Sequence, residues 1–160
     1  MPPDLVKVHF DAEPDYVEML RIGGEFVWAE PVAENRFRLD NTPFYVLWAR
    51  FKDVVEAEPT DRSIETPGGP VPVFEARVLI ERSGHATYHV IPYAEHAGAW
   101  AELWPRLETL GCTFESTGDD VHVELFAIDA PPEADRDAID AVLTEYESAD
   151  RIAWASSGGG

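Results

Sequence analysis

The sequence predicts an α+β protein with a mostly-β, barrel-like unit over residues 1–82, an α+β unit over 83–156 and a flexible tail over 157–160. Three observations support this prediction. Short segments of the first half alternate apolar and polar residues with period 2, which is typical of half-buried strands. The second half interleaves such segments with two stretches of helical periodicity. Hydrophobic residues make up 45% of the 160 positions, which is enough to build a core.

The first half is expected to form a small barrel. Residues 6–10 (VKVHF) alternate strictly and predict the first strand. Residues 11–22 predict a short helical turn that ends at Gly23-Gly24. Residues 59–70 are rich in Pro, Gly and polar side chains and predict a loop. Further strands are predicted at 25–30, 36–39, 53–57 and 71–81. Several short strands at this spacing favour an SH3-like barrel.

The second half is expected to follow the order βαββαβ. Strands are predicted at 88–93, 112–117, 121–128 and 152–155. Residues 95–110 predict a helix with an apolar face, in which Pro105 is expected to cause a kink or a break. Pro131-Pro132 predicts the start of a second helix, because proline is favoured in a first helical turn. This order is that of the ferredoxin-like split βαβ unit.

The charge limits the partners of this chain. It has 31 Asp and Glu against 12 Lys and Arg, a formal net charge of -19, and its lysines are Lys7 and Lys52. Such self-repulsion is screened in molar salt, where the Debye length is about 3 Å, so we expect a protein of a salt-accumulating cell. The alternative is an acidic surface that recognises a basic partner, or an acidic mimic. Either way we expect no binding to nucleic acid, which requires cationic side chains.

Other features predict the environment. Cys112 is the single cysteine, so no internal disulfide is expected, and its place after a helix C-terminus predicts an unreactive thiol. No segment approaches the roughly 20 apolar residues of a membrane span, so no membrane partner is expected. The first residues lack a signal-peptide pattern, which predicts a cytoplasmic location. The self-repulsion favours a monomer or a weak dimer.

Four segments carry a resemblance to a known family. They are residues 25–30 (EFVWAE), 41–44 (NTPF), 52–55 (KDVV) and 83–88 (SGHATY). Together they resemble the prokaryotic family catalogued as domain of unknown function 4265. The resemblance implies a shared fold and assigns neither an activity nor catalytic residues.

His85 is the first candidate for chemistry. It lies on a predicted turn beside Ser83 and Thr87, and Gly84 permits the positive φ of a tight turn. A histidine beside a serine suggests a general base next to a nucleophile. The alternative is a histidine that only hydrogen-bonds the turn, since the sequence identifies no third residue to orient it.

A second candidate comes from strand parity. If Tyr88 and Val90 face the helices, His89 and Tyr93 face the other side of the sheet. On the predicted neighbouring strand, parity adds His122, Glu124 and Phe126 to that side, which makes a possible ligand-binding face. His89, His122 and Glu124 are also ligand types that suit a divalent metal. The alternative is a solvated or covered sheet face without a metal.

These features predict a cytoplasmic binding or regulatory module without an intrinsic reaction or cofactor, whose partner is a protein or a small ligand. The alternative is a small metal-assisted or histidine-dependent hydrolase. It would use His85 or the face formed by His89, His122 and Glu124.

Overall fold

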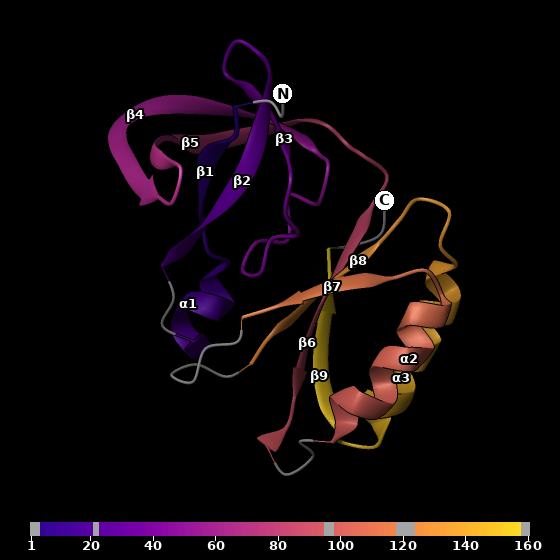
Figure 1. Ribbon diagram of the computed structural model, residues 1–160. Helices are drawn as coiled ribbons and strands as arrows, with labels where there is room; N and C mark the ends of the chain where they lie inside the picture. Colours follow the sequence, from indigo (N-terminus) through magenta and orange to yellow (C-terminus); the bar gives the residue numbers. More distant parts are fainter. Residues whose placement is uncertain (1–3, 21–22, 95–97, 118–123, 158–160) are drawn as a thin grey trace. The chain divides into compact units, whose positions relative to one another are not determined.

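The computed structural model describes residues 4–20, 23–94, 98–117 and 124–157. It divides the chain into two units, Met1–Gly84 and His85–Gly160 (Figure 1). The first unit consists mainly of strands, and the second combines four strands with two helices, which confirms the α+β class. Within the described ranges, the helices are too short or too polar to cross a bilayer.

The first unit contains a closed barrel. Its strands follow one another in sequence order: β1 (Val6–Asp11), β2 (Gly24–Ala33), β3 (Arg36–Leu39), β4 (Val54–Thr66) and β5 (Gly69–Glu81). Successive strands pair antiparallel, and the parallel pairing of β1 with β5 closes the barrel. The alternating residues of β1 form a half-buried strand, as predicted, because Val6, Val8 and Phe10 are buried in the barrel core. Helix α1 (Pro14–Leu20) joins β1 to β2.

The predicted loop over residues 59–70 is wrong. Strand β4 continues to Thr66 and β5 begins at Gly69, with pairing resumed after an irregularity between Pro59 and Ser63. Threonine hydroxyls supply hydrogen bonds where prolines have no N–H to donate. Thr60 Oγ1 donates to the Val73 carbonyl at 2.6 Å, and Thr66 Oγ1 to the Gly69 carbonyl at 2.7 Å. Gly69, with φ of +108°, permits the tight turn.

Carboxylate side chains hold the irregular segment between β3 and β4. Leu47 N donates to Glu13 Oε1 at 2.8 Å. Phe44 N and Tyr45 N both donate to Glu25. These bonds satisfy backbone groups that no strand partner reaches, and they allow this segment to bring Val46 and Ala49 into the barrel core.

Asp53 is the centre of a second set of bonds at the start of β4. Its side chain is fully buried, with an exposed fraction of 0%. One carboxylate oxygen accepts from Arg50 N at 2.9 Å and from Arg82 Nη1 at 3.1 Å, and the other accepts from Ser83 N at 2.8 Å. Asp53 therefore ties the entry of β4 to the residues that follow β5.

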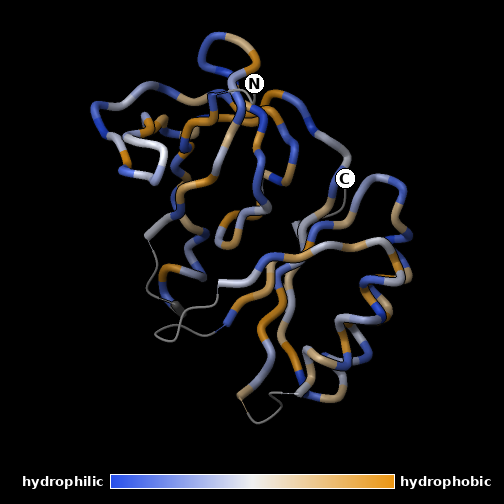
Figure 2. Tube along the Cα trace, viewed as in Figure 1, coloured by the Kyte–Doolittle hydropathy of each residue, from blue (hydrophilic) through white to orange (hydrophobic). Residues whose placement is uncertain are grey.

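The second unit is a four-stranded antiparallel sheet in the order β7-β8-β6-β9. Its elements are β6 (Ala86–Pro92), α2 (Ala99–Thr109), β7 (Thr113–Ser116), β8 (Phe126–Ala130), α3 (Arg136–Ser148) and β9 (Ile152–Ser156). This is the predicted order βαββαβ. Both helices lie on one side of the sheet (Figure 1). The core between the helices and the sheet includes Leu103, Leu107, Ile139 and Leu143. Blue and orange residues alternate along the helices, as expected for amphipathic segments (Figure 2).

Several predicted boundaries in this unit require correction. Helix α2 begins at Ala99 and continues through Pro105, which is exposed, so water can satisfy the carbonyl that loses its bond. Helix α3 begins at Arg136 and not at Pro131, because the Asp135 side chain accepts from Ala138 N at 3.1 Å and caps the helix there.

The end of the chain is partly ordered by β6. In the predicted tail over 157–160, Ser157 N donates to the Thr87 carbonyl at 2.8 Å, and Thr87 N donates to Ser157 Oγ. Residues 158–160 lie outside the described ranges. Ser157 therefore continues the ladder between β6 and β9, and the predicted flexible tail stays a prediction for residues 158–160.

Candidate functional site

The structure supplies His85 with the orienting residue that the sequence did not identify. Asp129 on β8 pairs with Thr87 on β6, so it projects from the sheet face opposite α2 and α3. His85, one residue before β6, places its Nδ1 at 2.9 and 3.0 Å from the two Asp129 carboxylate oxygens. Gly84 before it has φ of +90°, which confirms the predicted turn geometry.

The Asp129 carboxylate is largely withdrawn from water, with an exposed fraction of 5%. Burial raises the pKa of the Asp129 carboxyl, His85 opposes this effect, and Glu133 adds to it. When the Asp129 carboxylate is ionised it only accepts hydrogen bonds, and Nδ1 of His85 then carries the donated hydrogen. Nε2 is then the nitrogen that accepts a proton or a hydrogen bond when the imidazole is neutral.

Ser83 has a different role from the predicted nucleophile. Its hydroxyl donates to the Phe51 carbonyl at 2.7 Å, and its backbone N–H donates to Asp53. The single hydroxyl hydrogen is thus used to anchor the end of β5. A nucleophilic serine would instead donate that hydrogen to the base.

His89 and Phe126 were both predicted on the sheet face away from the helices. The structure has His89 on that face and Phe126 on the opposite one. His89 pairs with Ala127, and both lie on the face of Asp129, where His89 is buried with an exposed fraction of 2%. Phe126 pairs with Val90 and belongs to the core on the helix side, with its ring 3.7 Å from that of Trp100. The physical reason is packing, since the large aromatic ring stacks under α2 and the small alanine faces the other way.

Two of the other members of the predicted face, Tyr93 and Glu124, lie among the described residues. Tyr93 follows β6 and is 40% exposed, and Glu124 is exposed just before β8. His122 lies outside the described residues, as do 121 and 123 of the predicted strand. The metal alternative of His89, His122 and Glu124 therefore stays a prediction. Among the described residues, a group with metal-ligand spacing occurs in the barrel unit: His9, Asp11 and Glu75.

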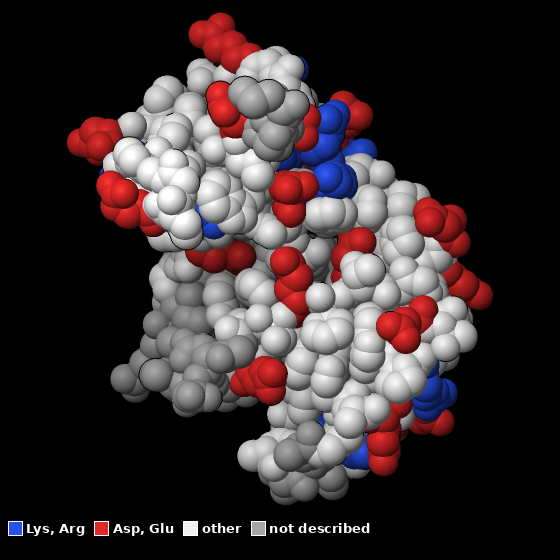
Figure 3. Space-filling model, viewed as in Figure 1, with Lys and Arg blue, Asp and Glu red and all other residues white. Residues whose placement is uncertain are grey.

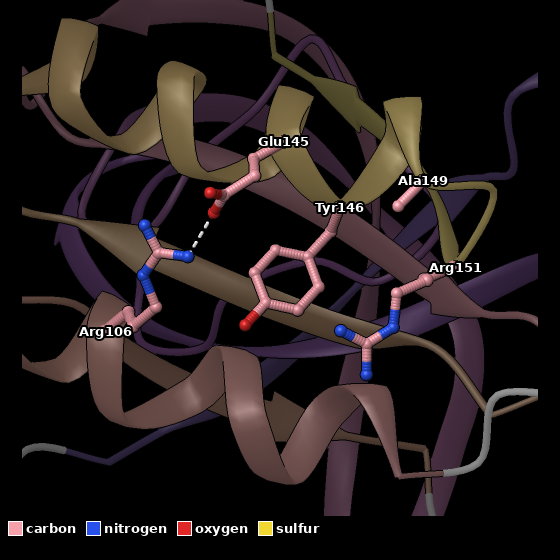
Figure 4. Close-up of a pocket in the computed structure, with 5 residues that line it drawn as sticks. All are labelled: Arg106, Glu145, Tyr146, Ala149 and Arg151. Atoms are coloured by element: carbon pink, nitrogen blue, oxygen red, sulfur yellow. Dashed lines mark hydrogen bonds and ion pairs between the residues drawn. The ribbon is translucent and has the colours of Figure 1, made fainter.

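A pocket of about 300 Å³ lies between the ends of α2 and α3 (Figure 4). It is lined by Arg106, Glu145, Tyr146, Ala149 and Arg151. Arg106 on α2 pairs with Glu145 on α3, and Arg151 pairs with Glu102 on α2 at 2.7 Å. The two guanidinium groups lie 5.7 and 5.0 Å from the Tyr146 ring. Since each arginine already has a carboxylate partner, this cluster links the two helices and is a poor anion site.

Comparison with known proteins identifies the family. The family model described as "Domain of unknown function (DUF4265)" matches residues 25–154. The chain belongs to this family. The resemblance noted in the sequence is therefore confirmed. No curated protein matches the DUF4265 chain.

A solved structure shares the fold of this DUF4265 chain. It is described as "Novel crystal structure of a hypothetical protein from Neisseria gonorrhoeae". The TM-score is 0.71 at 15% sequence identity, with 97% of this chain and 94% of that chain covered. At this identity the likeness concerns the fold alone.

The polar residues that carried the resemblance have structural roles in this DUF4265 chain. Asn41 Oδ1 accepts from Trp28 N at 2.9 Å, Glu25 accepts from the backbone at Phe44 and Tyr45, and Asp53 binds Ser83 N. Glu25 satisfies backbone N–H groups of the irregular connection between β3 and β4, Asn41 accepts from a backbone N–H of β2, and Asp53 accepts from the backbone just after β5. The recognisable motifs thus describe how the barrel is built.

Cys112 is expected to react slowly in the folded protein. Its thiol is buried, and burial, together with Asp129, raises its pKa to about 11. An increase of the thiol pKa from its usual 9.0 to about 11 lowers the thiolate fraction about a hundredfold near pH 8. Alkylation by iodoacetamide at pH 8 is therefore expected to be at least about a hundredfold slower than in urea-unfolded protein. Equal rates in the two states would contradict this prediction.

Proposed function

We propose that this DUF4265 chain is a binding or regulatory module of a salt-adapted cytoplasm, that it catalyses no reaction of its own, and that His85 contacts its ligand. The observation that carries this proposal is the pair of His85 and Asp129. A nearly buried carboxylate holds the imidazole in one orientation, while the hydroxyl of Ser83 is donated to a backbone carbonyl. The geometry supports recognition by an oriented imidazole better than it supports nucleophilic attack.

The finer architecture is part of the same proposal. The barrel order from β1 to β5 supports an SH3-like unit, and the sheet order β7-β8-β6-β9 supports a ferredoxin-like unit. Both folds serve many unrelated functions, so the function depends on the site and cannot be inferred from the architecture.

The distribution of charge supports salt adaptation over a dedicated acidic interface. Figure 3 shows Asp and Glu scattered over the visible surface of both units and not gathered in one patch. A net charge of -19 repels phosphate groups and favours a monomer or a weak dimer. The partner of this module is therefore proposed to be a protein or a small ligand, and not nucleic acid.

Capture from a lysate in molar KCl tests the role of His85. The wild-type chain is expected to retain a stoichiometric protein or small ligand, identified by mass spectrometry. The variant His85→Ala is expected to lose at least about nine tenths of it, because it removes the oriented imidazole. Arg106→Ala, on the helix side of the same unit, is the control and is expected to retain the ligand. Repeated recovery of the bare wild-type chain, or equal retention by His85→Ala, would overturn the proposal.

A histidine-dependent hydrolase is the second candidate, and the observation that favours it is the same orienting bond from Asp129. The module proposal predicts that the wild-type chain hydrolyses p-nitrophenyl acetate no faster than free imidazole does. Saturable hydrolysis that disappears in both His85→Ala and Asp129→Asn would establish the hydrolase in its place.

A further inference from the structure

Three side chains with metal-ligand atoms meet on the outside of the barrel. Val8 and Phe10 point into the barrel core, so His9 and Asp11 project outward from the same side of β1. The parallel pairing of β1 with β5 places Glu75 directly beside His9. The barrel closure thus brings together residues that lie 66 positions apart in the chain.

The distances are close to those of a coordinated ion. His9 Nδ1 lies 2.8 Å from Glu75 Oε2, and one ligand atom from each of His9, Asp11 and Glu75 falls within 4.8 Å of the others. A tetrahedral ion with bonds of about 2.0–2.1 Å separates its ligands by about 3.3 Å. His9 Nδ1 and Glu75 Oε2 are about 0.5 Å closer than that, at hydrogen-bond distance, so they would move slightly apart and lose the hydrogen between them when the ion binds. Asp11 is exposed, so a side-chain rotation can bring its carboxylate inward.

The imidazole of His9 is held with Nδ1 toward the Glu75 carboxylate. Its Nε2 faces Gly24 on β2, where an added Cβ would lie 2.6 Å from Nε2 and 2.4 Å from the Phe10 carbonyl. The Phe26 ring packs at 4.9 Å against the imidazole. Glycine at position 24 therefore provides the room that this ring orientation requires.

The neighbouring cations are placed against aromatic rings. Lys7 Nζ lies 3.9 Å from the centre of the Trp28 ring, and the Arg62 guanidinium lies 5.5 Å from the centre of the Phe26 ring. A bond between His9 and Glu75 has no need of a second carboxylate, and two carboxylates beside one imidazole repel each other. A bound cation would relieve that repulsion.

We propose that His9, Asp11 and Glu75 form a binding site for one divalent cation of the zinc class. Nδ1 of His9 and one oxygen from each carboxylate would be the protein ligands, and water would complete the coordination. The imidazole favours zinc-class ions over magnesium and calcium, which prefer oxygen ligands alone. The strongly acidic chain raises the local concentration of cations. This proposal is independent of that for His85, because the site lies in the barrel unit.

Isothermal titration of the tag-free full chain with zinc chloride in molar KCl tests the site. Wild type is expected to bind one zinc ion per chain, and His9→Ala and Asp11→Asn are each expected to bind it at least about tenfold more weakly. Asp11→Asn is the decisive variant, because it leaves the bond between His9 and Glu75 in place. Asp61→Asn removes one exposed carboxylate from β4 outside the cluster and is expected to bind like wild type.

Amide NMR spectra of the wild-type chain test the site without any substitution. Zinc is expected to shift the amide signals of residues 7–11 and 73–76, and magnesium at the same concentration is expected to leave them unchanged. Failure of the wild type to bind zinc stoichiometrically would overturn the proposal. So would zinc binding that survives both His9→Ala and Asp11→Asn, which would place the ion elsewhere.

Discussion

Replacement of Asp53 by alanine is expected to lower the free energy of unfolding of the barrel unit by about 3–5 kcal/mol. The carboxylate is fully buried and accepts hydrogen bonds from Arg50 N, Ser83 N and Arg82 Nη1. Each buried donor that loses its acceptor costs about 1–3 kcal/mol, and bonds to a charged group lie at the upper end. The lost hydrogen bonds would weaken mainly the segments where β4 begins and β5 ends.

Urea unfolding followed by circular dichroism measures this effect. Asp53→Asn is expected to lose less than Asp53→Ala, because the amide keeps one acceptor oxygen. Asp61→Ala changes an exposed residue of β4 and is expected to alter the free energy of unfolding by less than about 0.5 kcal/mol. A midpoint for Asp53→Ala equal to that of the wild type would show that water or neighbouring groups replace the carboxylate.

The melting temperature is expected to rise by several degrees between about 0.1 M and 2 M KCl. A net charge of -19 on 160 residues destabilises the compact state by self-repulsion. The Debye length falls from about 10 Å at 0.1 M to about 3 Å at 1 M, so this repulsion is largely screened in molar salt. Differential scanning calorimetry over a KCl series measures the effect.

A charge-neutralised variant separates screening from general effects of salt on apolar surface. Asp61→Asn, Glu65→Gln and Glu108→Gln together remove three exposed carboxylates. This triple variant is expected to melt higher than wild type at low salt and to depend less on KCl. A flat or falling melting temperature for the wild type would contradict salt adaptation.

Local patterns predicted the elements whose side chains repeat with a regular period. The bounds of β3 agree with the predicted strand over 36–39, and the apolar stripes of α2 and α3 lie in the core. These predictions succeed because burial of one face imposes a period of 2 or 3.6 on neighbouring residues. The same local reasoning failed for residues 59–70, where turn-forming residues extend a hairpin through cross-strand threonine bonds.

The candidate sites, too, were predicted from the sequence only in part. The sequence by itself determined the α+β class, the family and the acidic character, and it singled out the turn at His85 as a candidate site. Only the tertiary structure placed Asp129 beside His85, turned Phe126 under α2 and brought Glu75 to His9. The physical reason is that strand register and barrel closure join residues that are 44 and 66 positions apart. Periodicity along one segment carries no information about which residue of another strand will lie opposite it.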